Sequence, residues 1–191
     1  SFSGGHVLRI AAMDEKIAAV ISQVPFVSGL AVVLAGNFMR NLKLAAAGVK
    51  DLIGSYFGKV FYVPVSGEPG SLAALTAPGA VEGIKRLYPP GFVPDERIAA
   101  RIFLSAALYN PGRWAWMLKM PILVQVAAKD GTVPPAATHK AASRAHFVRC
   151  LEYNIDHFDI YVGKDFERAV RDQVDFLNEY LARRSLKNVK K

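Results

Sequence analysis

Several features are scarce in this sequence of 191 residues, and each scarcity excludes a class of protein. Cysteine occurs once, as Cys150, so no intramolecular disulfide can form and nothing indicates an oxidising compartment; we predict a cytoplasmic protein. No apolar run reaches the ~18 residues that a transmembrane helix needs, and we predict no membrane partner. Internal repeats and low-complexity tracts are also lacking. A composition of 52% hydrophobic and 21% charged residues is typical of a globular protein.

The chain carries a formal net charge of +8, which raises the question of nucleic-acid binding. Part of this excess lies in the tail at residues 182–191, and the rest is scattered along the chain. No nucleic-acid-binding motif accompanies the charge. We therefore expect a solvated surface with a basic tail, and no nucleic-acid partner.

Three segments predict strands. Short apolar runs at residues 16–26 and 120–130 are rich in β-branched residues, which is typical of buried parallel strands. Residues 147–155 alternate more strongly in polarity and predict a third strand nearer the edge of a sheet.

Helical spacing of apolar residues occurs around these strands, at residues 4–15, 134–145 and 165–184. The second of these segments has proline in its first turn. In the third, the residues expected to face the core are Phe166, Val170, Val174, Leu177 and Leu181. Helices that alternate with buried strands indicate the α/β class, with a parallel sheet flanked by helices.

Residues 27–118 break this alternation. They contain a long amphipathic stretch at 37–58, a loop rich in proline and glycine at 63–80, and helical segments at 94–109 and 112–119. A mostly helical block of this length is too long for one crossover and predicts an inserted helical cap or lid. The predicted domains are residues 1–26 (first core segment), 27–118 (cap) and 119–191 (C-terminal core).

The opening residues, Ser-Phe-Ser-Gly-Gly, fit a nucleophile elbow. In this sharp strand-to-helix turn, small neighbours avoid a clash while a strained backbone exposes the hydroxyl. Ser1 is the preferred nucleophile, with Ser3 and Gly4 as its small neighbours. Ser3 is the alternative nucleophile, with Ser1 as the small residue two positions before it. An ordinary helix N-cap serine beside a glycine turn is the third interpretation.

Two further residues carry candidate chemistry. Asp130 is the last residue of the segment 120–130 and comes directly after its buried strand. It precedes a turn and a helix that begins with proline, so we expect it at the carboxyl edge of the sheet. Taken alone, such an aspartate is more often a turn former or a helix cap. His157 follows the third predicted strand. The other histidines, His6, His139 and His146, are expected to face solvent.

The order Ser1, Asp130, His157, together with the elbow and the loop Asp-Gly-Thr-Val-Pro-Pro, resembles the α/β-hydrolase superfamily. Stretches such as SFSGGHVLRIAA and HFDIYVGKDFERAV are similar to a branch related to dienelactone hydrolases, lactonase-type enzymes and fungal polyketide transferases. The resemblance implies a serine hydrolase that acts on a small ester, thioester or lactone, with no cofactor and no metal.

The resemblance also implies a role for each residue. Ser1 attacks the substrate, His157 acts as general base, and Asp130 orients the imidazole. The backbone N–H of Phe2 supplies one oxyanion donor. Aromatic residues of the expected cap, among them Phe38, Trp114 and Trp116, are candidates for an apolar substrate pocket.

The resemblance covers the second half of the superfamily's fold, from the elbow onward. We therefore expect a fragment, a truncated reading frame, or one piece of an assembly with a missing N-terminal segment, a second chain or a further copy of itself. An unpaired strand edge predicts that the isolated chain is marginally stable, and the missing half of the fold, with its second oxyanion donor, predicts that the chain is inactive alone. The alternative function is a non-catalytic α/β-hydrolase-like binding module.

Overall fold

The computed structural model describes residues 1–182. They form two compact units. The first comprises Ser1–Val27 and the chain from Asn110 onward, and the second comprises Ser28–Tyr109. The predicted basic tail lies outside the described residues from residue 183 on, as do the last two residues of the helix predicted at 165–184.

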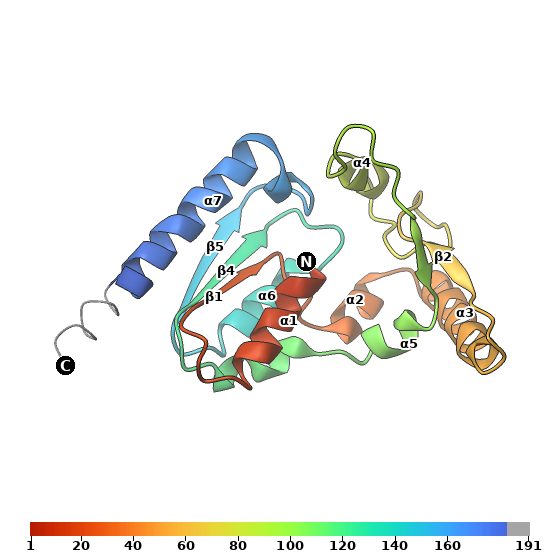
Figure 1. The fold of residues 1–191 in the computed structure, drawn as a ribbon, viewed down its shortest axis with the longest axis horizontal. Helices are drawn as coiled ribbons and strands as arrows, with labels where there is room; N and C mark the ends of the chain where they lie inside the picture. Colours follow the sequence, from red (N-terminus) through yellow and green to blue (C-terminus); the bar gives the residue numbers. More distant parts are fainter. Residues whose placement is uncertain (183–191) are drawn as a thin grey trace. The chain divides into compact units, whose positions relative to one another are not determined.

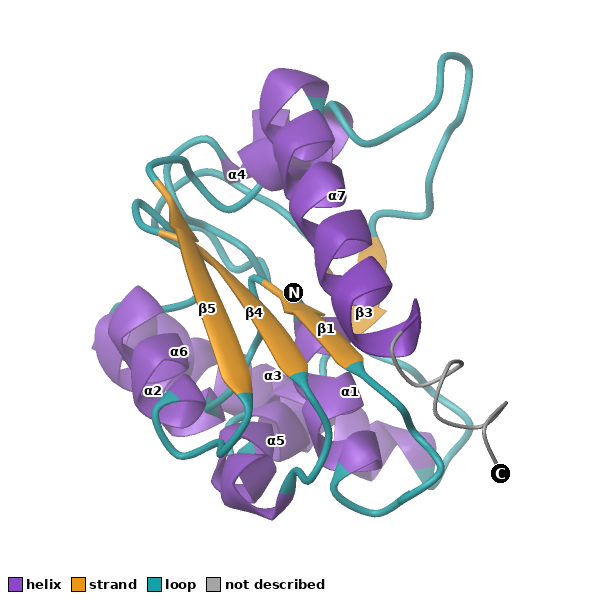
Figure 2. Cartoon of the chain, turned by 90° about the vertical axis from the view of Figure 1, so that its left-hand side faces the viewer, coloured by secondary structure: helices purple, strands orange, loops and turns teal. Residues whose placement is uncertain are grey.

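The first unit is built on a parallel three-stranded sheet (Figure 2). Its strands are β1 (Val20–Gln23), β4 (Ile122–Ala127) and β5 (Val148–Tyr153), in the order β1-β4-β5. All six residues of the central strand β4 are buried, and β5 lies at an edge as predicted. The predicted parallel strands are confirmed, although each is shorter than the apolar run that indicated it.

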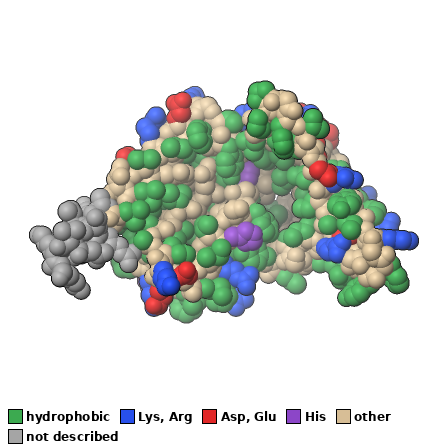
Figure 3. Space-filling model, in the orientation of Figure 1, with side chains coloured by type: hydrophobic (Ala, Val, Ile, Leu, Met, Phe, Trp, Pro, Cys, Tyr) green, Lys and Arg blue, Asp and Glu red, His purple; other side chains and the backbone are tan. Residues whose placement is uncertain are grey.

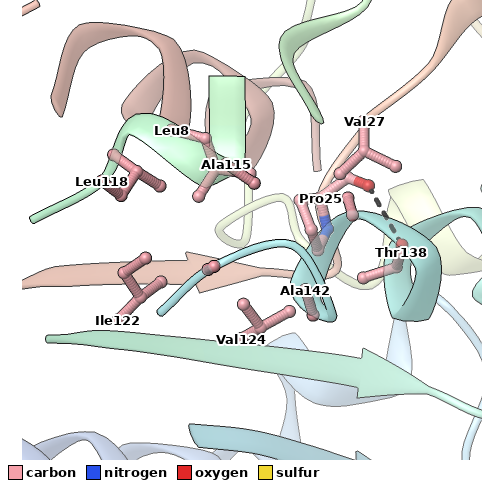
Figure 4. A pocket seen from close by; sticks show the side chains of 11 residues that line it. Leu8, Pro25, Val27, Ala115, Leu118, Ile122, Val124, Thr138 and Ala142 are labelled. Atoms are coloured by element: carbon pink, nitrogen blue, oxygen red, sulfur yellow. Dashed lines mark hydrogen bonds between the residues drawn. The ribbon is translucent and has the colours of Figure 1, made fainter. Parts of the chain in front are cut away.

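One face of this sheet is covered by α1 (Phe2–Ala11) and α6 (Pro135–Ala142), with the 3-10 helix η1 (Pro111–Met117) beside them (Figure 1). Leu8 and Ala11 of α1 are buried against the sheet, as their spacing predicts. An apolar cavity of about 10 Å³ remains among the side chains in Figure 4, where the Thr138 hydroxyl donates to the carbonyl of Pro25 at 3.5 Å. A space this small holds at most one water molecule, so it is a packing gap.

The other face is covered by α7 (Gly163–Leu177), which follows the short helix η2 (Asp159–Tyr161) and continues as a π-helical turn, η3 (Asn178–Ala182). The predicted core-facing stripe is wrong at three of its five residues, whereas Val170 and Leu177 are half-buried. Phe166, Val174 and Leu181 are each between 40% and 48% exposed, and the buried residues of α7 are Ala169 and Phe176.

The reason is a polar layer between α7 and the sheet. Gln173 donates to the side-chain oxygens of Gln23 (2.9 Å) and Gln125 (2.7 Å). Gln125 in turn donates to the Tyr153 hydroxyl at 2.8 Å, and that hydroxyl donates to Asp172 at 2.6 Å. Burial and the bond to Asp172 raise the pKa of Tyr153. Because hydrogen bonds fix this helix face, the apolar periodicity of the sequence identifies it only in part.

The second unit contains α2 (Gly29–Ala35), α3 (Phe38–Ser55), β2 (Tyr62–Pro64), α4 (Ala80–Lys85), β3 (Arg97–Ala99) and α5 (Ile102–Ala106). The long helix expected at 37–58 is confirmed as α3, and residues 65–79 form the expected loop. The helix expected over 94–109 is partly wrong, because β3 pairs antiparallel with β2. The Arg97 guanidinium lies 5.0 Å from the centre of the Tyr62 ring, so contacts between the strands override local helical preference.

A buried carboxylate organises the second unit. Asp51 of α3 is fully buried and accepts hydrogen bonds from the backbone N–H groups of Phe61 (2.7 Å) and Arg101 (2.9 Å). The Arg101 guanidinium bonds the same carboxylate at 2.7 Å. Burial works to raise the pKa of Asp51, but these donors outweigh it, and the pKa is lowered. One ionised side chain therefore ties three segments together.

Replacing this carboxylate tests its structural role. Asp51→Asn leaves the Arg101 guanidinium without its counter-charge, and we expect the midpoint of thermal unfolding to fall by about 10 °C at neutral pH. The matched control is Asp95→Asn, which removes an exposed ion pair with Arg97 and should shift the midpoint by less than about 2 °C. Because the pKa is lowered on folding, this stabilisation is present above pH ~4 and is lost as the pH falls through the folded-state value. Equal melting of the two variants would contradict the role.

The charged surface is mixed. On the face shown in Figure 3, lysine and arginine side chains form small separate groups over the described residues. Within residues 1–182, no helix combines the length and the apolar character needed to cross a bilayer.

Candidate functional site

The loops that follow β4 and β5 lie side by side beyond the carboxyl ends of these strands. Backbone hydrogen bonds continue past the strands, from Ala128 N–H to the Tyr153 carbonyl (2.8 Å) and from Lys129 N–H to the Ile155 carbonyl (3.0 Å). This pairing brings Asp130, in the first loop, next to His157, in the second.

Asp130 and His157 form a short hydrogen bond, with 2.6 Å between Asp130 Oδ2 and His157 Nδ1. Their side chains are only 4% and 2% exposed. The other carboxylate oxygen, Oδ1, accepts from the backbone N–H groups of Thr132 (2.8 Å) and Val133 (2.7 Å). An ionised carboxylate can only accept, so Nδ1 carries a proton and Nε2 keeps a lone pair. The pair thus provides an oriented imidazole base.

Asp156 connects the two loops, although nothing in the sequence distinguished it from an ordinary turn residue. Its Oδ1 accepts from the backbone N–H of His157 at 2.6 Å and from that of Gly131 at 3.4 Å. Its own N–H donates to Asp159 at 3.0 Å. Asp156 therefore holds the backbone at His157 in place.

Ser1 lies at the carboxyl end of the neighbouring strand, β1. Its carbonyl oxygen accepts from the backbone N–H of Phe26 at 3.0 Å, and its nitrogen donates to the carbonyl of Gln23 at 3.1 Å. The same nitrogen donates to the Tyr161 hydroxyl at 2.9 Å. The Tyr161 ring lies 6.3 Å, centre to centre, from the His157 ring. Tyr161, which the sequence analysis did not identify, thus connects Ser1 with the Asp130–His157 pair.

The electrostatics place Tyr161 within reach of the Asp130 charge. Burial and the charge of Asp130 raise the pKa of Tyr161 to about 12. Tyr161 is therefore a neutral hydroxyl at physiological pH.

Ser1 is the N-cap residue of α1, but its side chain makes no capping hydrogen bond. An ordinary capping serine uses its hydroxyl to accept from the first turn of the helix. The N-cap interpretation therefore gains no support from the contacts of Ser1. Ser3 lies in the first turn of α1 and is exposed.

Two glycines let α1 approach the end of β1 closely. A Cβ on Gly4 would lie 2.7 Å from the carbonyl oxygen of Gln23, and a Cβ on Gly5 would collide with the carbonyl oxygen of Phe26. Ser3 and Gly4 were the predicted small neighbours of Ser1, whereas Gly5 is the more tightly enclosed residue. Val24, next to these contacts, has a φ of 36°, which is strained for a β-branched residue.

The aromatic residues suggested for a substrate pocket are distributed over both units. Trp114 and Trp116 lie on η1 in the first unit, whereas Phe38 begins α3 in the second. Phe38 and Trp116 are exposed, and the Arg113 guanidinium lies 4.8 Å from the centre of the Trp114 ring. A pocket shared by these residues stays a prediction.

Metal ligation is not supported by the described part of the chain, where no three His, Cys, Asp or Glu side chains are grouped to hold an ion. The groups assembled at the carboxyl edge of the sheet are instead a hydroxyl-bearing residue, an imidazole and a carboxylate. These groups suit proton transfer and nucleophilic attack.

Comparisons with known proteins were made on the sequence and on the structure. The chain is 42% identical over 178 residues to the quorum-quenching protein AidA of Acinetobacter baumannii, covering 93% of this chain and 59% of AidA. The crystal structure of the α/β hydrolase GrgF from Penicillium sp. sh18 matches with a TM-score of 0.71 and 22% identity, over 94% of this chain and 61% of GrgF. The monoacylglycerol lipase of Paleococcus ferrophilus matches with a TM-score of 0.64 and 18% identity, over 93% of this chain and 65% of the lipase. No family model matches the sequence.

These comparisons confirm the predicted fold class and the predicted resemblance to α/β hydrolases. Because the two solved structures are only 22% and 18% identical to this chain, their matches show the fold alone. The chain spans 59% of the length of AidA, so the activity of the whole relative does not transfer to it directly.

Proposed function

We propose that this chain, which has the fold of the α/β hydrolases, is a serine hydrolase that cleaves a small ester, thioester or lactone through an acyl-enzyme. The observation that carries the proposal is the buried 2.6 Å contact between His157 and Asp130. The contact of Ser1 with Tyr161, beside the His157 ring, gives it further support.

In the proposed reaction, Ser1 Oγ attacks the substrate carbonyl carbon while Nε2 of His157 takes the hydroxyl proton. Asp130 holds the imidazole in the tautomer that has Nε2 free and stabilises the imidazolium that forms. His157 then protonates the leaving group. A water molecule, activated by the same base, attacks the acyl-enzyme and releases the acid.

The negative charge that develops on the substrate oxygen needs hydrogen-bond donors. The backbone N–H of Phe2 follows the proposed nucleophile and belongs to the first turn of α1, where free amides and the helix dipole favour an anion. Such a donor contributes about 3 kcal/mol to the stabilisation of the transition state in other hydrolases.

We infer the substrate class from the chemistry of the candidate site and from the name of one relative, AidA. A nucleophilic serine with a histidine base suits acyl transfer, and the relative AidA is described as a quorum-quenching protein. A small-molecule acyl compound is therefore the substrate that we propose. A chain that binds such compounds without turnover is the alternative.

Hydrolysis of a short p-nitrophenyl ester tests the proposal. In the full-length protein that contains this chain we expect turnover with an initial burst of nitrophenolate, and a rate about 10⁴-fold lower in Asp130→Asn, because the amide favours the wrong imidazole tautomer. The matched control is Asp14→Asn, at an exposed turn, which should leave the rate unchanged. Absence of turnover in the wild type would favour the binding module, and full activity of Asp130→Asn would contradict the role of Asp130.

A further inference from the structure

A second group of chemically reactive side chains lies in the first unit, outside the candidate site. It consists of His139 on α6 and of Cys150 and Glu152 on β5. Residues two apart in a strand point to the same face of the sheet, so the thiol and the carboxylate of β5 share a face.

The imidazole of His139 bridges the other two side chains. Its Nε2 lies 2.6 Å from Glu152 Oε2, and its Nδ1 lies 3.7 Å from Cys150 Sγ. Because the ionised carboxylate can only accept, Nε2 carries the proton, and Nδ1 presents a lone pair to the thiol. The order is therefore nucleophile, base and orienting carboxylate, which is the arrangement that activates a nucleophile.

All three side chains are exposed, so a reagent in solution can reach the thiol. His139 faces solvent as predicted, but its two partners could not be recognised from the sequence. The thiol is exposed but partly desolvated by its neighbours, and this desolvation, together with the charge of Glu152, raises the pKa of Cys150. The sulfur therefore keeps its proton in the resting protein, and its reaction needs a base at the moment of attack.

We propose that Cys150, His139 and Glu152 form a second reactive site, in which the Cys150 thiol exchanges with low-molecular-weight disulfides. The Cys150 proton passes to His139 Nδ1 as the sulfur attacks one sulfur atom of the disulfide. The S–S bond of the reagent breaks and a mixed disulfide forms on Cys150. The leaving thiolate takes the proton from His139 and departs as a thiol, so one disulfide is consumed and one is formed.

A disulfide fits this site better than a carbonyl compound does. Attack on a disulfide occurs in line at sulfur and passes through no tetrahedral oxyanion, so a nucleophile, a base and open access are sufficient. Cys150 provides the nucleophile and His139 provides the base, and the exposed position of the thiol provides the access. The proposal is independent of the hydrolase activity, because it shares no residue with the candidate site.

The rate of reaction with dithiobis(nitrobenzoate), an aromatic disulfide, tests the proposal. The sequence has one cysteine, so every equivalent of coloured thiol released reports on Cys150. At neutral pH we expect His139→Gln to react at least about tenfold more slowly than the wild type, because the base is lost.

The matched control is His146→Gln, another exposed histidine, which should react at the wild-type rate. In concentrated guanidinium chloride all variants should react at the same rate, which separates the effect of geometry from any change in the thiol itself. Incubation with oxidised glutathione should add one glutathione to the intact mass of the wild type and none to Cys150→Ser. Native rates for His139→Gln within twofold of the wild type would overturn the proposal.

Discussion

The Ser1→Ala variant is expected to hydrolyse a short p-nitrophenyl ester about 10⁶-fold more slowly than the wild type, which places its rate near the detection limit. Removing the nucleophile from a serine–histidine–aspartate site leaves only the binding and oxyanion contributions. The structure supports this position because Ser1 contacts Tyr161 beside the His157 ring and leaves its hydroxyl out of helix capping.

The control is Ser3→Ala, which makes the same chemical change two residues further along the chain. Ser3 is exposed in the first turn of α1, and its removal should change the rate by less than about twofold. Loss of activity in Ser3→Ala with activity retained in Ser1→Ala would move the nucleophile to Ser3.

The His157→Gln variant is expected to show a similar loss, about 10⁶-fold, because the oriented imidazole that takes the proton from the serine hydroxyl is removed. Glutamine retains a polar side chain that can donate to Asp130, so the loss of the base is separated from the loss of the buried hydrogen bond. Ester hydrolysis and thermal unfolding should be measured together, so that an inactive but folded protein is recognised.

The control for this variant is His146→Gln, at an exposed position of the same unit, which should retain the wild-type rate and melting temperature. Wild-type activity in His157→Gln, or equal losses in the two histidine variants, would contradict the assignment of the base.

The core of the sheet could be predicted from the sequence because parallel strands buried on both faces form nearly continuous apolar runs. β4, which is buried throughout, is the clearest case. The face of α7 that contacts the sheet could not be predicted, because Gln173 and Asp172 face Gln125 and Tyr153 there, and a polar layer leaves no apolar period. β3 was missed because its pairing partner, β2, lies more than 30 residues earlier in the chain.

The candidate site could likewise be predicted only in part from the sequence. Asp130 and His157 could be proposed because each follows a strand whose carboxyl end lies at a shared edge, and the contact between them agrees with that expectation. The Tyr161 hydroxyl accepts from the Ser1 nitrogen, and the Asp156 carboxylate accepts from the backbone of the other loop; such contacts between distant segments leave no pattern in one sequence. The tight enclosure of Gly5 depends on the path of the chain at Phe26, which the sequence alone does not specify.

The most direct test of the proposed mechanism is to map the covalent adduct of a fluorophosphonate probe by mass spectrometry of the digested protein. The account predicts one adduct, on Ser1, that forms in the wild type and fails to form in His157→Gln. An adduct on Ser3 or any other residue, or unchanged labelling in His157→Gln, would contradict it.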